Sequence, residues 1–372
     1  MCQHVALVFG TRPEAIKLFP VIYALRERTS LRISVLVTGQ HRAMLDQVLA
    51  VADIRPDIDL NIMVPNQSLD GLTARLLLAI GEAFDADRPD FVIVQGDTTS
   101  AMVASLAAFY RKIPVAHVEA GLRTGNIYSP WPEEINRRII SPIASLHFAP
   151  TKLAAANLTS ENVDPVGIHI TGNTGIDALL LTKSRIDGLG ELTSGVRKVM
   201  APFHSQRIIL VTAHRRENFD GGLANIAQAI KTLSLRDDVA VVFPVHPNPH
   251  VRKVIDATLR GSNKIVLLDP LEYVPFVYLM SVATLILTDS GGIQEEAPSL
   301  GKPVLVLRDT TERPEGIEAG TAKLVGTNAK RIVSETERLL DDRRHYEAMS
   351  GAINPYGDGR ASERIASVIN VQ

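Results

Sequence analysis

Three acidic side chains stand where a parallel sheet would place them at its rim. Asp97 and Glu119 each follow a short apolar run, and Glu133 opens a helical pattern over residues 133–143. Carboxyl groups at such a rim are partly buried, which raises their pKa toward the range useful for proton transfer. Asp97 taken alone could simply cap the helix expected to start near residue 99. The three together indicate general acid/base catalysis.

Cationic side chains follow a different apolar run. His214, Arg215 and Arg216 follow residues 207–212 after one intervening residue, and such a group is suited to hold a diphosphate by charge-assisted hydrogen bonds. A lone histidine after a strand is more often structural, but two adjacent arginines favour a binding role. The charge-dense segment 308–315, which contains Arg313, is expected to reach the same place, although charge density alone is typical of a solvated loop.

A turn before the first predicted helix is a candidate anion site. Residues 10–14 read GTRPE, with proline suited to the first helical position. Arg12 stands beside the free amides of the helix start, and Lys17 follows one turn later. Anion binding and a simple capped loop are equally consistent with this segment alone.

A second turn, DSGG at residues 289–292, gives a sharper signal. Ser290 is suited to cap the helix that follows, and Gly291 and Gly292 leave backbone amides open to a phosphate. Glu296, one turn further, is placed to accept hydrogen bonds from a ribose diol. A glycine-rich turn with a surface glutamate is the plainer alternative.

Several motifs of cofactor and metal sites are absent from the sequence. It contains no G-x-G-x-x-G, no Walker A sequence and no H-E-x-x-H. His246 and His250 have the spacing of a zinc pair, but Pro247 and Pro249 between them argue against an ordinary helix. We therefore expect no bound dinucleotide, no other cofactor and no essential metal.

The elements that position these residues alternate between short strands and amphipathic helices, which indicates parallel βαβ units. A polar, glycine-containing stretch over 182–206 interrupts the rhythm and reads as a linker. We therefore predict two doubly wound α/β domains, residues 1–180 and 205–355, with a ligand in the cleft between them. The strands are expected at residues 4–9, 32–38, 91–95, 114–119, 146–149 and 169–171 in the first domain, and at 207–212, 239–244, 264–268, 285–288 and 303–307 in the second.

Composition narrows the class of protein. The 372 residues include 39 Lys and Arg against 41 Asp and Glu, a net charge of −2 that provides no general field for nucleic acid or anionic membranes. A single cysteine, Cys2, excludes a disulfide scaffold and fits a reducing compartment. No apolar run reaches the length of a membrane span. The sequence predicts a cytoplasmic protein with no nucleic-acid or membrane partner.

The motifs taken together resemble the bacterial non-hydrolysing UDP-N-acetylglucosamine 2-epimerases. The likeness runs in matching order from the first strand to the C-terminal tail, which makes it far more specific than any single motif. The motifs that carry it are GTRPE (10–14), QGDTT (95–99), HVEAGLR (117–123), PEEINR (132–137), HRREN (214–218), DSGG (289–292), RPEG (313–316) and NPYGDG (354–359).

The resemblance implies a glycosyltransferase-B-type fold of two Rossmann-like domains. It also implies a homodimer and a last helix, about residues 356–372, that returns to the N-terminal domain. The family interconverts UDP-N-acetylglucosamine and UDP-N-acetylmannosamine without added cofactor or metal, and supplies sugars for cell-surface polysaccharide.

The resemblance also assigns site residues. Asp97, Glu119 and Glu133 match the acid/base carboxylates, and His214 matches a histidine on the diphosphate side. The remaining residues that we assign to the substrate are Arg12, Lys17, Phe276, Ser290, Gly291, Gly292 and Glu296 for UDP, and Arg137, Arg215 and Arg313 for the sugar and diphosphate.

Some members of the family bind a second UDP-N-acetylglucosamine as an activator. This chain keeps Gln40, His41 and Gln67 of that site, but has Ala43 and Asn66 where activated relatives commonly carry polar or basic residues. The resemblance therefore leaves activation open.

The chemistry of the sugar explains the residue types. The hydrogen on C2 is not acidic, so we expect loss of UDP from C1 to accompany its removal, giving a 2-acetamidoglucal to which UDP adds back. Cations hold the leaving diphosphate, and carboxylates serve the two faces of C2. The alternatives are a UDP-sugar-dependent glycosyltransferase, a hydrolysing epimerase and, least favoured, a UDP-sugar sensor.

Overall fold

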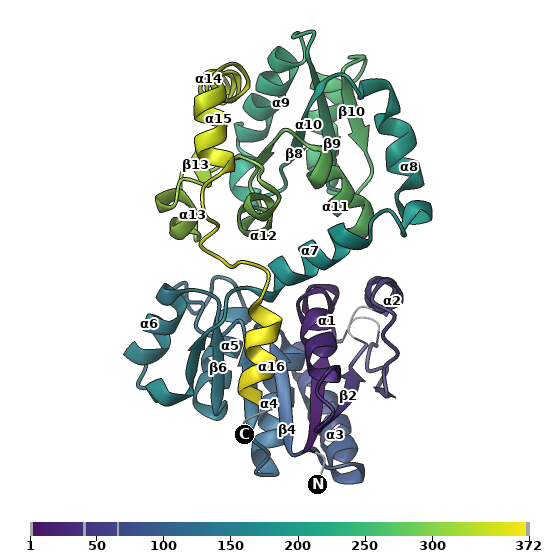
Figure 1. Ribbon diagram of the computed structural model, residues 1–372, viewed down its shortest axis with the longest axis vertical. Coiled ribbons are helices and arrows are strands. Elements are labelled where there is room, and N and C mark those ends of the chain that lie inside the picture. Colours follow the sequence, from purple (N-terminus) through teal and green to yellow (C-terminus); the bar gives the residue numbers. More distant parts are fainter. Residues whose placement is uncertain (1–2, 40–41, 65–66, 370–372) are drawn as a thin grey trace. The chain divides into compact units, whose positions relative to one another are not determined.

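The chain forms two compact units in the computed structural model, which describes residues 3–39, 42–64 and 67–369. The first unit consists of Met1–Ala178 and Gly357–Gln372, and the second of Leu179–Tyr356. Figure 1 shows each unit as a parallel sheet with helices packed around it. The predicted fold class, two parallel-sheet α/β domains, is confirmed.

The first unit is built on a seven-stranded parallel sheet. Its strands are β1 (Gln3–Phe9), β2 (Leu31–Val37), β3 (Ile58–Asp59), β4 (Phe91–Gln95), β5 (Val115–Val118), β6 (Leu146–Ala149) and β7 (Ile168–Ile170). They lie in the order β3-β2-β1-β4-β5-β6-β7, so the winding direction reverses between β1 and β4. Ligands of such sheets bind beyond the carboxyl ends of the strands at the reversal.

Helices cover both faces of this sheet. Ala6 and Val8 of β1 pack into a core with the helices after β3 and β4, whereas Val5 and Leu7 alternate to the opposite face, where the first helix packs. The helices are α1 (Arg12–Arg26), α2 (Arg42–Val51), α3 (Leu69–Ala86), α4 (Thr99–Tyr110), α5 (Glu133–Ile143), α6 (Lys152–Ser160), the 3-10 turn η1 (Pro165–Gly167), α7 (Thr174–Arg185) and α16 (Ala361–Ile369).

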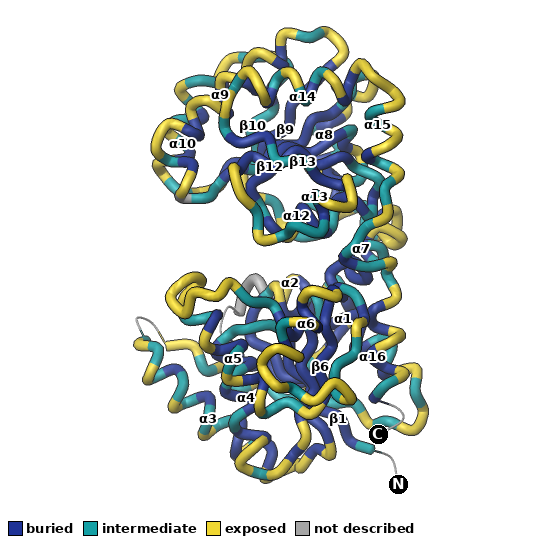
Figure 2. Tube along the Cα trace, turned by 90° about the vertical axis from the view of Figure 1, so that its left-hand side faces the viewer, coloured by how far each residue is buried: buried dark blue, intermediate teal, exposed yellow. Residues whose placement is uncertain are grey.

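The second unit has a six-stranded parallel sheet. Its strands are β8 (Arg207–Thr212), β9 (Val239–Pro244), β10 (Ile265–Leu268), β11 (Leu285–Thr288), β12 (Val304–Val306) and β13 (Ala322–Leu324). The order β10-β9-β8-β11-β12-β13 reverses between β8 and β11. Figure 2 shows that the central strands of both sheets are buried, whereas the edge strand β7 contains no buried residue.

The helices of the second unit complete its two outer layers. They are α8 (Gly190–Met200), η2 (Ala201–Phe203), η3 (Arg216–Asn218), α9 (Gly222–Leu233), α10 (Pro249–Leu259), α11 (Tyr273–Val282), α12 (Gly291–Glu296), η4 (Ala297–Leu300), α13 (Pro314–Glu318), α14 (Ala329–Asp341) and α15 (Arg343–Ser350). Helices α9, α10 and α14 pack together over one shared core. No helix in the described part of the chain is long and apolar enough to cross a membrane.

The stretch expected to be a linker is mostly helical. Helix α7 runs to Arg185, and α8, whose buried residues include Val196 and Met200, packs against α11. The Arg197 guanidinium lies 4.6 Å from the centre of the Tyr278 ring. The glycines that suggested a linker lower helix propensity, but tertiary packing outweighs that preference.

The last helix, α16, belongs to the first unit and packs against α1. Asp177 of α7 caps it, because its carboxylate accepts hydrogen bonds from the amides of Ala361 (3.3 Å) and Ser362 (2.8 Å) and from the Ser362 hydroxyl (2.6 Å). Burial raises the pKa of Asp177 above its usual value, against the effect of these bonds. The end of the chain is therefore held by the helix that leads out of the first unit.

Candidate active site

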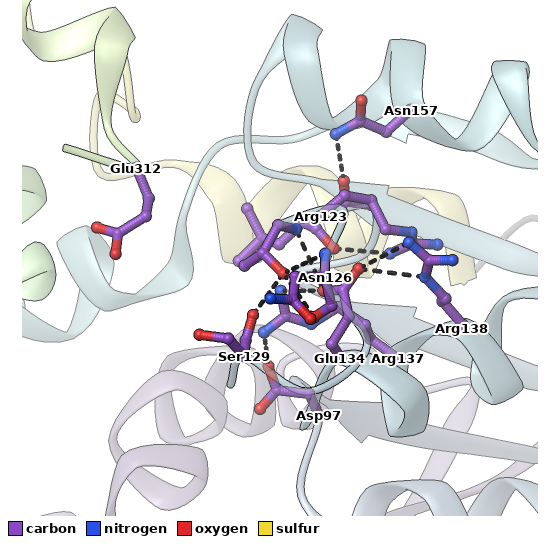
Figure 3. Close-up of polar contacts among 12 residues, drawn as sticks. Asp97, Arg123, Asn126, Ser129, Glu134, Arg137, Arg138, Asn157 and Glu312 are labelled. Atoms are coloured by element: carbon purple, nitrogen blue, oxygen red, sulfur yellow. Dashed lines mark hydrogen bonds and ion pairs between the residues drawn. The ribbon is translucent and has the colours of Figure 1, made fainter. Parts of the chain in front are cut away.

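Asp97 lies just beyond β4, at the reversal in the first sheet. Gly96 turns the chain with a φ of +70°, and Thr98 rather than Asp97 caps α4, its hydroxyl accepting from the Ala101 amide at 3.0 Å. The Asp97 carboxylate instead pairs with Arg137 of α5 (Figure 3). Capping therefore does not account for Asp97, whose side chain is 28% exposed.

The surroundings of Asp97 favour its protonated form. Burial raises its pKa above the usual value; the Arg137 cation opposes the rise, and the nearby Glu119 carboxylate adds to it. Asn136 of α5 donates to the Asp97 backbone carbonyl at 2.9 Å, so the same helix holds backbone and side chain. A carboxyl group with a raised pKa beside a cation is suited to general acid/base chemistry.

Glu119 follows β5 in a backbone conformation that few side chains adopt. Its φ is +65°, a conformation that is costly for a residue other than glycine and that recurs at functional sites. The side chain is 10% exposed and bonds to Lys17 of α1 and Gln95 of β4. Lys17, expected to bind UDP, therefore holds a carboxylate in this structure.

The start of α1 is occupied by a side chain of its own. Glu14 accepts hydrogen bonds from the amides of Gly10 (3.0 Å) and Thr11 (2.8 Å) and from the Thr98 hydroxyl (2.6 Å). Burial raises the pKa of Glu14, and these bonds oppose the rise. Glu14 therefore already binds the amides that were expected to attract an anion. The partly exposed Arg12 side chain is the anion ligand that remains in this segment.

The two glutamates that open α5 differ in their surroundings. Glu133 is partly exposed, and its carboxylate has no side-chain hydrogen bond within the described residues. Glu134 is fully buried and accepts from the Thr124 amide (3.2 Å), Arg137 (3.2 Å) and Arg138 (3.0 Å), as Figure 3 shows. Glu134 lies three and four residues before Arg137 and Arg138, a spacing that places the three side chains on one face of a helix. The sequence alone could therefore have indicated these ion pairs.

His214 and Asp289 meet at the reversal in the second sheet, beyond β8 and β11. One oxygen of the buried Asp289 carboxylate accepts from the amides of His214 and Arg215, both at 2.8 Å. The other oxygen lies 3.1 Å from Nδ1 of His214, whose side chain is 38% exposed. Nε of Arg215 is buried without a partner among the described residues, which suits a group that awaits an anion.

The start of α12 differs from that of α1. Ser290 occupies the capping position, but its hydroxyl makes no capping hydrogen bond, so no side chain caps the helix start at Gly291 and Gly292. The Arg313 guanidinium lies beside Gly291 and pairs with the buried Glu295. Of the two helix starts that were predicted to bind an anion through backbone amides, the start of α12, after β11, is the one without a side-chain cap.

The other residues predicted to bind UDP in the second unit, Phe276 and Glu296, lie on helices α11 and α12. Phe276 is in the first turn of α11 and Glu296 ends α12, and both are partly buried. In the 308–315 loop, Arg308 is buried and pairs with Glu217 and Glu312, so the loop is braced rather than merely solvated.

The residues of the expected activator site are only partly described. Gln67 pairs with Arg75 of α3, and its amide lies 3.2 Å from the Met63 sulfur. Gln40 and His41 lie outside the described residues. Among residues 3–39, 42–64 and 67–369, no three His, Cys, Asp or Glu side chains form a group that could hold a metal ion.

The sequence matches a described family along nearly its whole length. The model of the family described as UDP-N-acetylglucosamine 2-epimerase matches residues 23–370. The Escherichia coli K12 protein named UDP-N-acetylglucosamine 2-epimerase is 52% identical over 370 residues, covering 99% of this chain and 98% of that protein. The chain belongs to the UDP-N-acetylglucosamine 2-epimerase family.

Solved structures of UDP-N-acetylglucosamine 2-epimerases share the fold. The Neisseria meningitidis enzyme, solved bound to UDP-N-acetylglucosamine, is 48% identical with a TM-score of 0.87, and each chain is covered completely. The Methanocaldococcus jannaschii enzyme, solved with UDP-N-acetylglucosamine and UDP, is 34% identical with a TM-score of 0.78, again over both whole chains. The glycotransferase of kitacinnamycin is 13% identical with a TM-score of 0.64, covering 99% of this chain and 98% of that one, so it shares the fold alone.

Two residues of this family member have site contacts that the sequence analysis did not assign. Gln95 ends the apolar strand β4 and bonds to Glu119. Asp289 heads the DSGG motif but received no role, although it holds the His214 loop. In both cases the available signal was a polar residue at the carboxyl end of a buried strand.

Proposed function

We propose that this chain is a non-hydrolysing epimerase that interconverts UDP-N-acetylglucosamine and UDP-N-acetylmannosamine. One observation carries the proposal beyond family membership: each unit gathers its reactive side chains at the reversal of its own sheet. The carboxylates lie beyond β4 and β5, and the histidine, arginine and uncapped helix start lie beyond β8 and β11. A reaction that moves a proton and releases a diphosphate needs both sets.

The reaction consists of an elimination and its reversal. A carboxylate removes the proton from C2 while the bond between C1 and the diphosphate oxygen breaks, which leaves a 2-acetamidoglucal and UDP. UDP then adds back to C1, and a proton enters C2 from the opposite face. The overall change is inversion at C2, with no oxidant or reductant consumed.

The carboxylates of the first unit supply the proton transfers. The Glu119 carboxylate lies close enough to Asp97 to raise the pKa of Asp97. Lys17 stabilises ionised Glu119, and Arg137 stabilises ionised Asp97. Glu133, with a carboxylate free of internal hydrogen bonds in the described chain, is the third acid/base group of the proposal.

The second unit holds the leaving UDP. His214, Arg215 and Arg313 provide positive charge, and the uncapped start of α12 at Gly291 provides amides. Glu296 is assigned to the ribose and Phe276 to the uracil, as the family resemblance implies. Arg12 of the first unit is assigned to the diphosphate on the same ground.

We further propose a homodimer. Three helices that pack side by side, α3, α4 and α5, carry large exposed apolar side chains, among them Leu78, Phe109, Tyr110 and Ile139. Light scattering of the purified protein is expected to give twice the chain mass, and Leu78→Glu with Phe109→Glu to give a monomer. A monomeric parent protein would contradict this part of the proposal.

The proposed setting is the cytoplasm, where the product would supply N-acetylmannosamine units for cell-surface polysaccharide. This part rests on the resemblance and on the single cysteine of the chain.

Proton NMR of the purified protein with UDP-N-acetylglucosamine in D₂O tests the reaction. We expect deuterium at C2 and a new UDP-N-acetylmannosamine signal. Release of free N-acetylmannosamine would show a hydrolysing enzyme instead. An unchanged substrate would contradict the proposal and favour a transferase that lacks its acceptor.

A further inference from the structure

Asp289 is a fully buried carboxylate placed against a partly exposed histidine. It directly follows β11, where its own amide bonds to the Thr212 carbonyl of β8 at 3.2 Å. The Thr212 and Thr288 hydroxyls, 2.6 Å apart, tie the ends of the same two strands together. The backbone of Asp289 is thus fixed at the centre of the sheet.

The two oxygens of Asp289 have different partners. Oδ2 accepts from the amides of His214 and Arg215 (both 2.8 Å) and from the Asn218 side chain (3.1 Å), which anchors the whole loop. Oδ1 is buried, and no aligned hydrogen bond reaches it within the described chain. Nδ1 of His214, 3.1 Å away, is the donor placed to do so.

The carboxylate is an acceptor only. Burial raises the pKa of Asp289, but the adjacent His214 ring and the hydrogen bonds from the amides of Arg215 and His214 outweigh burial, so the pKa lies below its usual value. An ionised carboxylate has no proton to donate. The proton between Oδ1 and the imidazole therefore belongs to Nδ1.

A second imidazole lies on the face of the first. The rings of His214 and His246 are stacked, with centroids 5.5 Å apart and planes 14° from parallel. Nδ1 of His246 accepts from the Asn248 amide at 3.2 Å, so its own orientation is fixed. His214 is held at one edge by Asp289 and on one face by His246, and Nε2 is the ring nitrogen left for a ligand.

We propose that Asp289 is a positioning residue that keeps a proton on Nδ1 of His214 and thereby directs Nε2 toward the departing diphosphate. The proposal rests on the proposed function, which assigns the diphosphate to His214. It goes beyond loop anchoring, because Oδ2 alone would anchor the loop. The role of Oδ1 is to choose which nitrogen carries the proton.

Asp289→Asn separates the two roles. The amide oxygen can still accept from the backbone amides of His214 and Arg215, whereas its NH₂ group would face Nδ1 and force that nitrogen to accept. In a neutral ring the proton then moves to Nε2. Asn218→Ala is the matched control, because it removes one anchor of the loop and leaves the pair of Oδ1 and Nδ1 intact.

NMR of histidines labelled with ¹⁵N reads the proton position directly, with His214 assigned from the spectrum of His214→Gln. We expect Nδ1 to be protonated in the parent protein and in Asn218→Ala, and unprotonated in Asp289→Asn. A protonated Nδ1 in Asp289→Asn, or an unprotonated one in the parent, would overturn the proposal. This measurement needs no turnover, so it stands even where the parent protein shows no epimerisation and the proposed function fails.

Kinetics of C2 exchange test the consequence for the reaction. We expect Asp289→Asn to lower kcat by about 10- to 100-fold with little change in KM, the loss typical when a carboxylate that orients a metal-bound histidine is removed. In a His214→Gln background the same substitution should have almost no further effect. Independent, multiplicative losses in the double variant, or equal losses in Asp289→Asn and Asn218→Ala, would show a structural role only.

Discussion

The two sites at the sheet reversals are built with opposite charge. In the first unit the partly exposed reactive groups are carboxylates that pair with cations. Arg137 pairs with Asp97, and Lys17 pairs with Glu119. In the second unit the partly exposed group is a histidine, and the buried carboxylate of Asp289 backs it. The two sheets reverse their winding in the same way, but the signs of the reactive group and of its supporting group are exchanged between the two sites.

This difference shows how one fold can serve two chemical tasks. The loops after the strands at a reversal are free to vary, whereas the sheet that presents them is a packed core. A group that exchanges protons gains from a partner of opposite charge that sets its pKa, and a group that binds a diphosphate gains from a partner that fixes its orientation. Four predictions test this division of labour.

The largest effect is expected from Asp97→Asn, which removes a proton-transfer group and keeps the shape of the side chain. We expect kcat for C2 exchange to fall by about 10²–10⁴-fold, the contribution typical of a general acid or base. UDP affinity, measured by calorimetry, should be nearly unchanged, because Asp97 is not among the residues assigned to UDP. An exchange rate equal to that of the parent would remove Asp97 from the mechanism.

His214→Gln should produce the next largest effect, on the leaving group. Loss of one group that stabilises developing negative charge costs about 10²–10³-fold in kcat. Unlike Asp97→Asn, this variant should also bind UDP more weakly in the same calorimetric assay. His204→Gln, on an exposed residue elsewhere in the second unit, is the control. If His214→Gln bound UDP as tightly as the parent protein, His214 would not contribute to UDP binding, and the proposed difference between the two sites would be wrong.

Acid should unfold the first unit before the second. Burial lowers the pKa of His117 to about 3 and of His147 to about 4, whereas no described histidine of the second unit is buried. The unfolded chain binds these protons below pH 6.5, so stability is complete above that value and falls as the pH drops toward the folded pKa values. At pH 4.5 each group costs roughly 2–3 kcal/mol.

Hydrogen exchange measured by mass spectrometry at pH 7 and pH 5, corrected for the intrinsic exchange rate, checks this prediction. Peptides from β5 and β6 should lose protection at pH 5 while those from β8 and β9 retain it. Equal loss in both units would show that the two buried imidazoles do not control acid stability.

The smallest effect is expected from Arg137→Gln, read in the pH profile. Because Arg137 lowers the pKa of Asp97, its removal should raise that pKa further. The acid limb of kcat/KM should therefore move to higher pH. Arg138→Gln also loses a bond to Glu134 but does not touch Asp97, so its profile should stay in place. A shift in both variants would implicate Glu134 rather than Asp97.

Most strands, and the helix α5, could be predicted from local patterns. The expected helix 133–143 coincides with α5, and the expected strands 91–95, 207–212, 239–244 and 285–288 coincide with β4, β8, β9 and β11. The missed strands, β3 and β13, have two and three residues and lie at sheet edges, too short for any periodic signal.

Partners in the site could not be predicted in the same way. The positions of Asp97, Glu119 and His214 followed from their places at strand ends, but the pair of Lys17 and Glu119 joins residues 102 apart in the chain. Spacing along the sequence gives no information about such a contact. The same limit explains why Glu14, rather than an anion, occupies the amides of Gly10 and Thr11.

The return of α16 to the first unit has a consequence for synthesis on the ribosome. That unit lacks α16 until the whole second unit, Leu179–Tyr356, has been made, because the second unit lies between its two segments. At about 5–20 residues per second the delay is roughly 10–40 s. During that time the face of α1 that α16 covers and the Asp177 carboxylate have no partner from α16. The N-terminal half is therefore the last to mature, although it is the first to be translated.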